Sequence, residues 1–132
     1  GVQLEVGSVS TDFEFEPQGV TFEKCCRYYY ELAGADNTAL PTGSQTGTGG
    51  GSAYYQYPVE MRAAPTLAYS NLSHFGVQPD MAQQNPDAIT IGYTTTSSGW
   101  IACTFSADAA KNLTYRFYTI SADARLNFSA DL

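Results

Sequence analysis

The sequence is poor in positive charge. Six Lys plus Arg stand against 13 Asp plus Glu among 132 residues, which gives a formal net charge of −7. The few cations are scattered singly, whereas a nucleic-acid binder needs a clustered basic surface to displace counterions from phosphates. We therefore expect neither nucleic acid nor an anionic membrane surface as a partner.

Long apolar runs are missing as well. No stretch approaches the roughly 18 apolar residues of a membrane span, so we expect no membrane insertion. The chain opens inside an alternating segment at residues 1–6. We therefore expect it to be a fragment of a longer polypeptide.

The three cysteines do not form a disulfide framework. Cys25 and Cys26 are neighbours, and Cys103 lies in an alternating apolar pattern typical of a buried strand residue. A catalytic thiol needs a positioned base, and the only histidine, His74, lies in a distant loop. We expect reduced, structural thiols.

Aromatic residues are abundant, with 10 Tyr and 7 Phe. Tyrosine at this density suits half-buried strands and interfaces. Several segments alternate with a period of two, and turn signals separate them. We predict an all-β fold, a jelly-roll-like β-sandwich of about eight strands with one short helix over residues 20–26, capped by Thr21. The strands expected after this helix are residues 27–32, 53–59, 66–70, 88–95, 100–106, 113–122 and 125–128, with a hairpin connection at 96–99.

A proline-bracketed segment, residues 57–67, divides two of these strands. Pro58 and Pro65 each fix their own φ and push the preceding residue into extended geometry, which holds Met61 and Arg62 between two rigid points. The segment predicts a rigid crossing between strands or sheets.

Two connecting segments are longer than compact domains usually contain. Residues 35–52 include a run of Gly, Ser and Thr at 42–51 with the composition of a flexible linker, and we expect it to be mobile. Residues 71–87 contain side chains that can pack on one another, so we expect an ordered loop.

Catalytic and metal sites find little support. Asp12, Glu14 and Glu16 alternate along one strand, which indicates a solvated edge more than the opposed carboxyl pair of a glycosidase. Asp80 and Asp87 could supply oxygen ligands to calcium, yet no calcium-loop spacing is present and ordinary turn chemistry explains them better. We predict no catalytic residue, no metal and no cofactor.

The aromatic residues near predicted loop ends are the better indication of function. A ring there can stack on a sugar while neighbouring polar side chains bond its hydroxyls. The alternative is that the rings fill the core or a subunit interface, and rings on both faces of the same strands favour an interface. These residues are Tyr54, Tyr55, Tyr57, Phe75, Tyr93 and Trp100.

Four phrases of the sequence resemble a module found at the C-terminal ends of bacteriophage tail-fibre, head-fibre and related virion proteins. They are QLEVGSVSTDFE at 3–14, CRYY at 26–29, PVEMRAAPT at 58–66 and ISADARL at 120–126. They cover both ends and the middle of the chain and leave the two long connecting segments unmatched. Departures from the usual pattern are the doubled Cys25-Cys26 and the Gly-rich run.

The resemblance implies a small jelly roll, often trimeric, at the tip of a fibre or spike that attaches to host-surface glycans. It also implies that residues 1–17 are the end of a preceding domain or a linker strand, and that residues 18–132 are the receptor-binding domain. The family supplies no catalytic residues. The module would belong to the virion and be assembled in the host cytoplasm.

The function expected is therefore non-catalytic attachment of a homotrimer, joined to the rest of the fibre or virion, to a bacterial surface polysaccharide. The expected contacts are in the 71–87 loop and in two rings beside it, namely His74, Phe75, Asp80, Gln83, Tyr54 and Trp100. The first alternative is a purely structural module for trimerisation or capsid decoration. The second is a small depolymerase or esterase.

Overall fold

The computed structural model describes residues 15–47, 49–78, 83–106 and 114–130. These ranges hold nine strands, one α-helix and one short 3-10 helix. In chain order the elements are α1 (Gln18–Cys26), β1 (Tyr29–Ala33), β2 (Gly43–Gly47), β3 (Gly50–Gln56), β4 (Thr66–Tyr69), η1 (Leu72–His74), β5 (Phe75–Gln78), β6 (Ala88–Thr94), β7 (Ser98–Thr104), β8 (Thr114–Thr119) and β9 (Arg125–Ser129).

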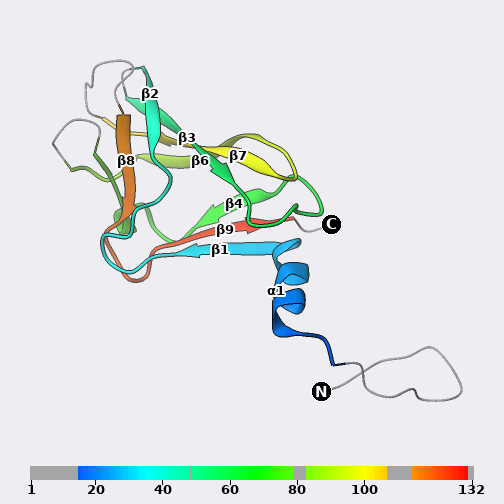
Figure 1. Cartoon of the computed structure of the whole chain (residues 1–132). Coiled ribbons are helices and arrows are strands. Elements are labelled where there is room, and N and C mark those ends of the chain that lie inside the picture. The colour runs from blue at the N-terminus through cyan, green and yellow to red at the C-terminus, as the bar shows by residue number, and fades with distance from the viewer. Residues whose placement is uncertain (1–14, 48, 79–82, 107–113, 131–132) are drawn as a thin grey trace, which may run out of the picture.

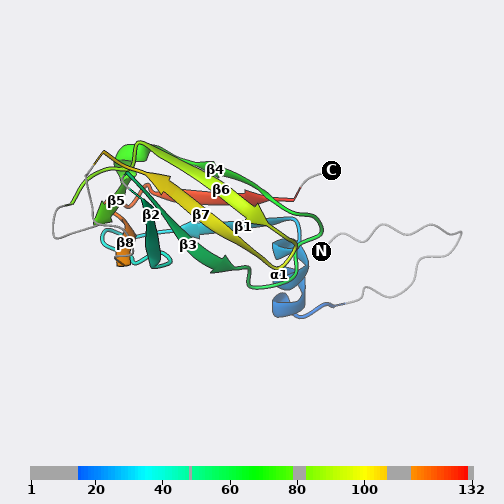
Figure 2. The same cartoon turned by 90° about the horizontal axis from the view of Figure 1, so that it is seen from above.

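The strands form two layers (Figures 1 and 2). One is a three-stranded sheet in the order β1-β9-β4, and the other is a six-stranded sheet in the order β5-β8-β2-β3-β7-β6. The strand pairs in both sheets are antiparallel. The all-β sandwich is confirmed, with more strands than expected, and jelly-roll connectivity stays a prediction.

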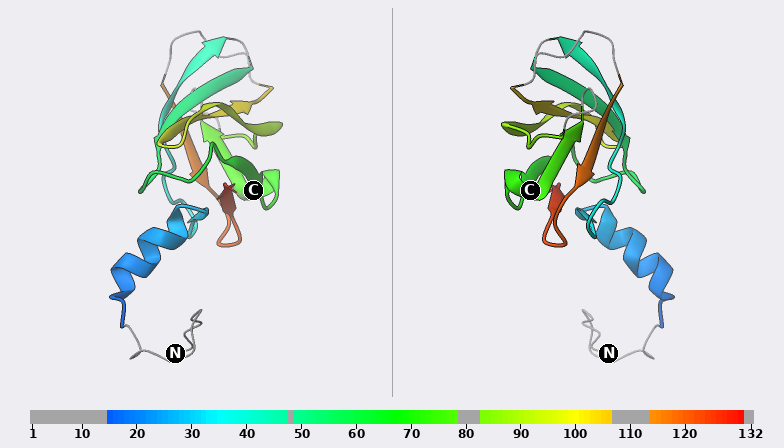
Figure 3. Two further views of the ribbon diagram at one scale, coloured as in Figure 1. Left: turned by 90° about the vertical axis from the view of Figure 1, so that its right-hand side faces the viewer. Right: turned by 90° about the vertical axis from the view of Figure 1, so that its left-hand side faces the viewer.

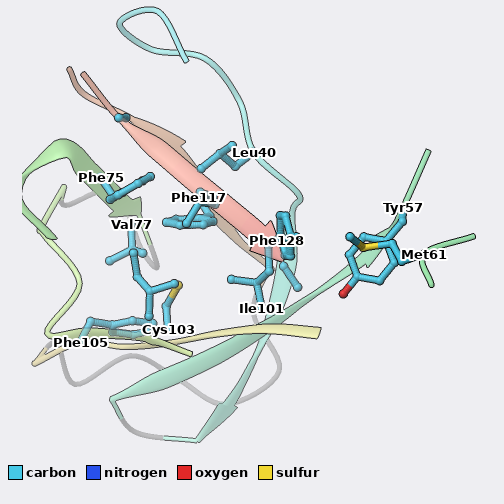
Figure 4. Packing of buried hydrophobic residues seen from close by; sticks show 14 of the residues in the cluster. Leu40, Tyr57, Met61, Phe75, Val77, Ile101, Cys103, Phe105, Phe117 and Phe128 are labelled. Atoms are coloured by element: carbon cyan, nitrogen blue, oxygen red, sulfur yellow. The ribbon is translucent and has the colours of Figure 1, made fainter. Parts of the chain in front are cut away.

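The core lies between the two layers. Leu126 and Phe128 of β9 are fully buried in the same cluster as Ile101 and Cys103 of β7. Figure 4 shows Phe128, Ile101 and Cys103 in this cluster. The Phe128 ring stacks on Tyr55 with centroids 5.3 Å apart. Complete burial of a phenylalanine contributes about 1.5–3 kcal/mol, so this ring is a principal contact between the sheets.

The predicted crossing at residues 57–67 is confirmed. The chain leaves β3 in the six-stranded sheet and enters β4 in the other layer. The Tyr57 amide donates to the Ser97 carbonyl at 2.9 Å, and the Met61 amide donates to the Thr96 carbonyl at 2.7 Å. Tyr57 and Met61 are buried, so the crossing closes one end of the sandwich.

The Gly-rich segment is not the mobile loop that we expected. Its first half is β2, which pairs with β8 on one side and with β3 on the other. A hairpin turn through Gly49, whose φ of 78° favours glycine, connects it to β3. Backbone hydrogen bonds to two neighbours need no apolar side chain, which is why the composition misled the prediction.

The 71–87 segment is also more regular than expected. It contains η1 and β5, and β5 pairs with β8 from Phe75 to Gln78. An isolated bridge joins Val77 to Gln84, so the segment folds back on itself. The prediction of an ordered segment is confirmed for its described part.

Helix α1 begins at Gln18 and not at residue 20. The predicted cap is wrong, because Pro17 is the N-cap residue and the Thr21 hydroxyl donates to the Glu16 carboxylate at 3.1 Å. Of its residues only Cys26 is buried, and the helix extends away from the sandwich (Figure 3).

The three cysteines are free, as predicted. Cys26 and Cys103 are buried and Cys25 is exposed. Burial raises the pKa of the Cys26 thiol. The predicted boundary after residue 17 coincides with the start of α1, but residues 1–14 lie outside the described residues, so the division into domains stays a prediction.

Candidate functional site

Three exposed aromatic side chains gather on the outer side of the six-stranded sheet. Tyr54 on β3 and Trp100 on β7 are register partners, and 59% and 47% of their surfaces are exposed. Tyr93 on β6 is 87% exposed, and its ring meets Trp100 edge to face with centroids 6.3 Å apart. We call these three residues the ring face.

A β-bulge in β6 accounts for the direction of Tyr93. Ile91 pairs with Ile101 and Thr94 pairs with Gly99, so β6 has one more residue than β7 between these pairs. Regular alternation from the half-buried Ile91 would turn Tyr93 inward. The extra residue turns the ring outward instead, which is the kind of redirection that bulges provide beside functional sites.

Small polar side chains adjoin the rings. A surface depression of about 440 Å³ is lined by Tyr54 and Trp100 together with four residues of the β2–β3 region, which are Thr42, Gly43, Ser44 and Ser52. Tyr54 and Trp100 are both exposed, and among the described residues neither the Tyr54 hydroxyl nor the Trp100 indole nitrogen forms a hydrogen bond with the protein. The rings and hydroxyls are therefore available to a ligand.

The structure places the predicted ligand contacts of the 71–87 segment in different environments. Phe75 is fully buried against Phe117, with ring centroids 5.7 Å apart, so its prediction as a ligand contact is wrong. It begins β5, and its side chain belongs to the core. Asp80 lies outside the described residues, and its role stays a prediction.

His74 and Gln83 remain accessible to different extents. His74 is half-buried, and its Nδ1 lies 3.0 Å from the Ser70 hydroxyl. The His74 carbonyl accepts a hydrogen bond from the Ile120 amide at 2.8 Å. Gln83 is exposed beside the Val77–Gln84 bridge. Both remain predicted contacts.

The sheet separates this segment from the rings. In the strand order β5-β8-β2-β3-β7-β6, two strands lie between β5 and β3. His74 and Phe75, at the β5 end of the segment, are therefore not beside Tyr54, and Asp80 lies outside the described residues. Tyr54 and Trp100 instead join Tyr93 and the hydroxyls of β2 and β3. Sequence reasoning missed Ser44 and Ser52, because it placed them in a mobile loop.

A second depression, of about 500 Å³, lies between α1 and the 57–67 crossing. It is lined by Val20, Glu23, Lys24, Arg27, Val59 and Glu60. Several of these charges already have partners, since Lys24 pairs with Glu16 and the Glu60 carboxylate accepts from the Thr96 hydroxyl at 2.9 Å. We regard the ring face as the stronger candidate, because its polar groups are less engaged within the protein.

Within the described ranges, no three His, Cys, Asp or Glu side chains come together as a metal site would require. None of the helices described is long and apolar enough to span a bilayer. Of the three alternating carboxylates, Glu16 is described, and its hydrogen bond from Lys24 lowers the pKa of its carboxyl group.

Comparison of the chain with protein-family models, with curated proteins and with solved structures finds no match.

Proposed function

We propose that this chain is a non-catalytic attachment module that binds host-surface glycans through the ring face. The supporting observation is the grouping of Tyr54, Tyr93 and Trp100 beside a depression lined with hydroxyl groups. Exposed rings offer an apolar surface to the C–H side of a sugar, and the hydroxyls can bond its edges.

The assignment to a phage or phage-like fibre is supported by the resemblance of the four phrases. The phrases at 26–29 and 58–66 contact each other, because the Arg62 amide donates to the Arg27 carbonyl at 2.7 Å. The Arg62 guanidinium also lies 5.6 Å from the centroid of the Tyr28 ring. These phrases build the frame, whereas the ring face lies outside them, as expected where one scaffold carries different specificities.

The test uses the intrinsic fluorescence of Trp100, which is the only tryptophan of the chain. The protein is titrated with polysaccharide isolated from candidate host cells, and binding at the ring face should change the emission until it saturates. A matched Tyr29→Ala variant, altered on the other sheet, should bind as the parent does. Failure of every host polysaccharide to bind, with the fold intact, would reject this function.

A second candidate function is assembly into a homotrimer, with the chain as a trimerisation or capsid-decoration module. The observation that favours it is α1, whose Val20 and Phe22 are exposed. Isolated helices shorter than about 12 residues are marginal in water, so α1 gains from a neighbour. Mass measurement in solution, with Phe22→Ser as the variant, tests this function independently of glycan binding.

A further inference from the structure

Four adjacent strands of the six-stranded sheet contain no charged residue. β2, β3, β7 and β6 are neighbours in the sheet, and Asp, Glu, Lys, Arg and His are all absent from their described lengths. Surfaces of small domains usually carry charges at about a quarter to a third of positions. An uncharged sheet surface of this width is therefore unusual in a chain of net charge −7.

The register shows what replaces the charges. Ser44 pairs with Ser52, Ser52 with Ala102, and Ala102 with Thr90, so one row of small side chains crosses all four strands. The next row contains the Tyr54–Trp100 pair. The outer side of this sheet thus combines hydroxyls and rings.

Two charged groups that flank these strands along the chain, Asp87 and Glu60, lie beyond the strand ends and have partners. At one end, the Asp87 carboxylate accepts from the Ser106 hydroxyl at 2.9 Å. At the other end, the Glu60 carboxylate accepts from Thr96 at 2.9 Å. On the neighbouring strand β8, the Arg116 guanidinium lies 5.7 Å from the centroid of the Tyr118 ring.

From this arrangement we infer that the ring face selects an uncharged glycan and discriminates against acidic ones. A hydroxyl is both donor and acceptor, so it matches the hydroxyls of a neutral sugar in either direction. A carboxylate or phosphate on the ligand would lose hydration without gaining a cationic partner on β2, β3, β7 or β6. The negative net charge of the protein also repels an acidic ligand as it approaches. This inference rests on the proposed function and names its ligand class.

The first experiment places the protein on an array that holds neutral, uronic-acid-containing, sialylated and phosphorylated bacterial polysaccharides. Binding confined to neutral polysaccharides is expected. Binding to acidic polysaccharides that is lost in the Tyr54→Ala/Trp100→Ala double variant would overturn the inference and leave the attachment function standing. Binding to none would overturn both.

The second experiment changes the charge at one position of the depression. Ser44→Lys and Ser44→Asp are titrated with the best neutral polysaccharide of the array in low and high salt. We expect the two variants to differ from each other by less than about twofold, since an uncharged ligand gains nothing from either sign. A difference of about tenfold or more, reduced by salt, would show that the ligand is charged and would overturn the inference.

The third experiment separates a ligand surface from an interface between copies. Solution mass is measured for the parent and for the Tyr54→Ala/Trp100→Ala double variant. An unchanged mass is expected. A fall in mass would show that the rings hold two copies together, and it would overturn the inference.

Discussion

The two outer faces of this sandwich expose aromatic side chains to a similar extent but use them differently. On the three-stranded sheet, Tyr29 is 47% exposed, as Trp100 is on the six-stranded sheet. The Tyr29 hydroxyl donates to the Glu31 carboxylate at 3.0 Å, and Arg125 pairs with Glu31 at 3.3 Å. The rings of Tyr54 and Trp100 have no charged neighbour on their own strands.

Exposure alone therefore does not identify a binding surface. Around Tyr29, the charged groups satisfy one another, and the Arg125 guanidinium also donates to the Ala122 and Ala124 carbonyls at 2.7 and 2.8 Å. On the ring face, donors and acceptors are left to the solvent or to a ligand. We expect substitutions on the first face to affect stability slightly, and substitutions on the second to affect binding.

The largest effect is expected from a substitution in the core that both sheets share. Phe128 is fully buried between the sheets and stacks on Tyr55. Phe128→Ala should lower the free energy of unfolding by about 3–5 kcal/mol through lost burial and the cavity left behind. Urea denaturation followed by circular dichroism measures this. A loss below about 1 kcal/mol would mean that the two sheets do not share this core.

Removal of one ring from each face is the sharpest test of the comparison. Trp100→Ala should weaken glycan binding by about 2 kcal/mol, or about 30-fold, as truncation of a buried aromatic contact commonly does. Tyr29→Ala should leave the affinity unchanged, although the two parent residues are equally exposed. Isothermal titration calorimetry compares both with the parent protein. An equal loss of glycan affinity in the two variants would contradict the claim that only the ring face binds the glycan.

A smaller effect is expected from pH, and it concerns rings that face inward. Burial raises the pKa of Tyr55 and of Tyr57 above the usual tyrosine value of about 10. The folded protein then keeps these protons at a pH where the unfolded chain releases them. The free energy of unfolding should therefore hold below about pH 10 and fall as the pH rises further. Denaturation between pH 8 and 11 measures this, and Tyr55→Phe should flatten the fall.

The smallest effect is expected from the ion pair of the charged face. The Glu31 and Arg125 side chains are 36% and 38% exposed, so water screens their attraction. Glu31→Gln should lower the free energy of unfolding by less than about 1 kcal/mol. Glycan affinity should stay at the parent value. A clear loss of affinity in this variant would place part of the binding site on the three-stranded sheet.

The sequence predicted those parts of the fold that local chemistry specifies. Alternating aromatic residues marked the second half of β3, where Tyr54 is exposed and Tyr55 is half-buried, and the two prolines marked the crossing to β4. The single helix was also predictable, although its exposed Phe22 shows that an apolar residue on one helical face does not guarantee burial.

The parts that sequence reasoning missed depend on strand pairing. β2 lacks apolar side chains and is a strand because β3 and β8 bond both of its edges. The bulge that turns Tyr93 outward follows from the match between β6 and β7, which no local pattern reveals. Phe75 looked like a loop residue because β5 is too short for its alternation to be recognised.

The central claim is that a glycan lies on the ring face, and a crystal structure of the complex tests it most directly. Crystals would be soaked with oligosaccharide fragments of the polysaccharide that binds best in solution. We predict density for sugar over Trp100 and Tyr54, with hydroxyls reaching Ser44 and Ser52. Density at the α1 depression or beside His74 and Gln83, with the ring face bare, would contradict this account.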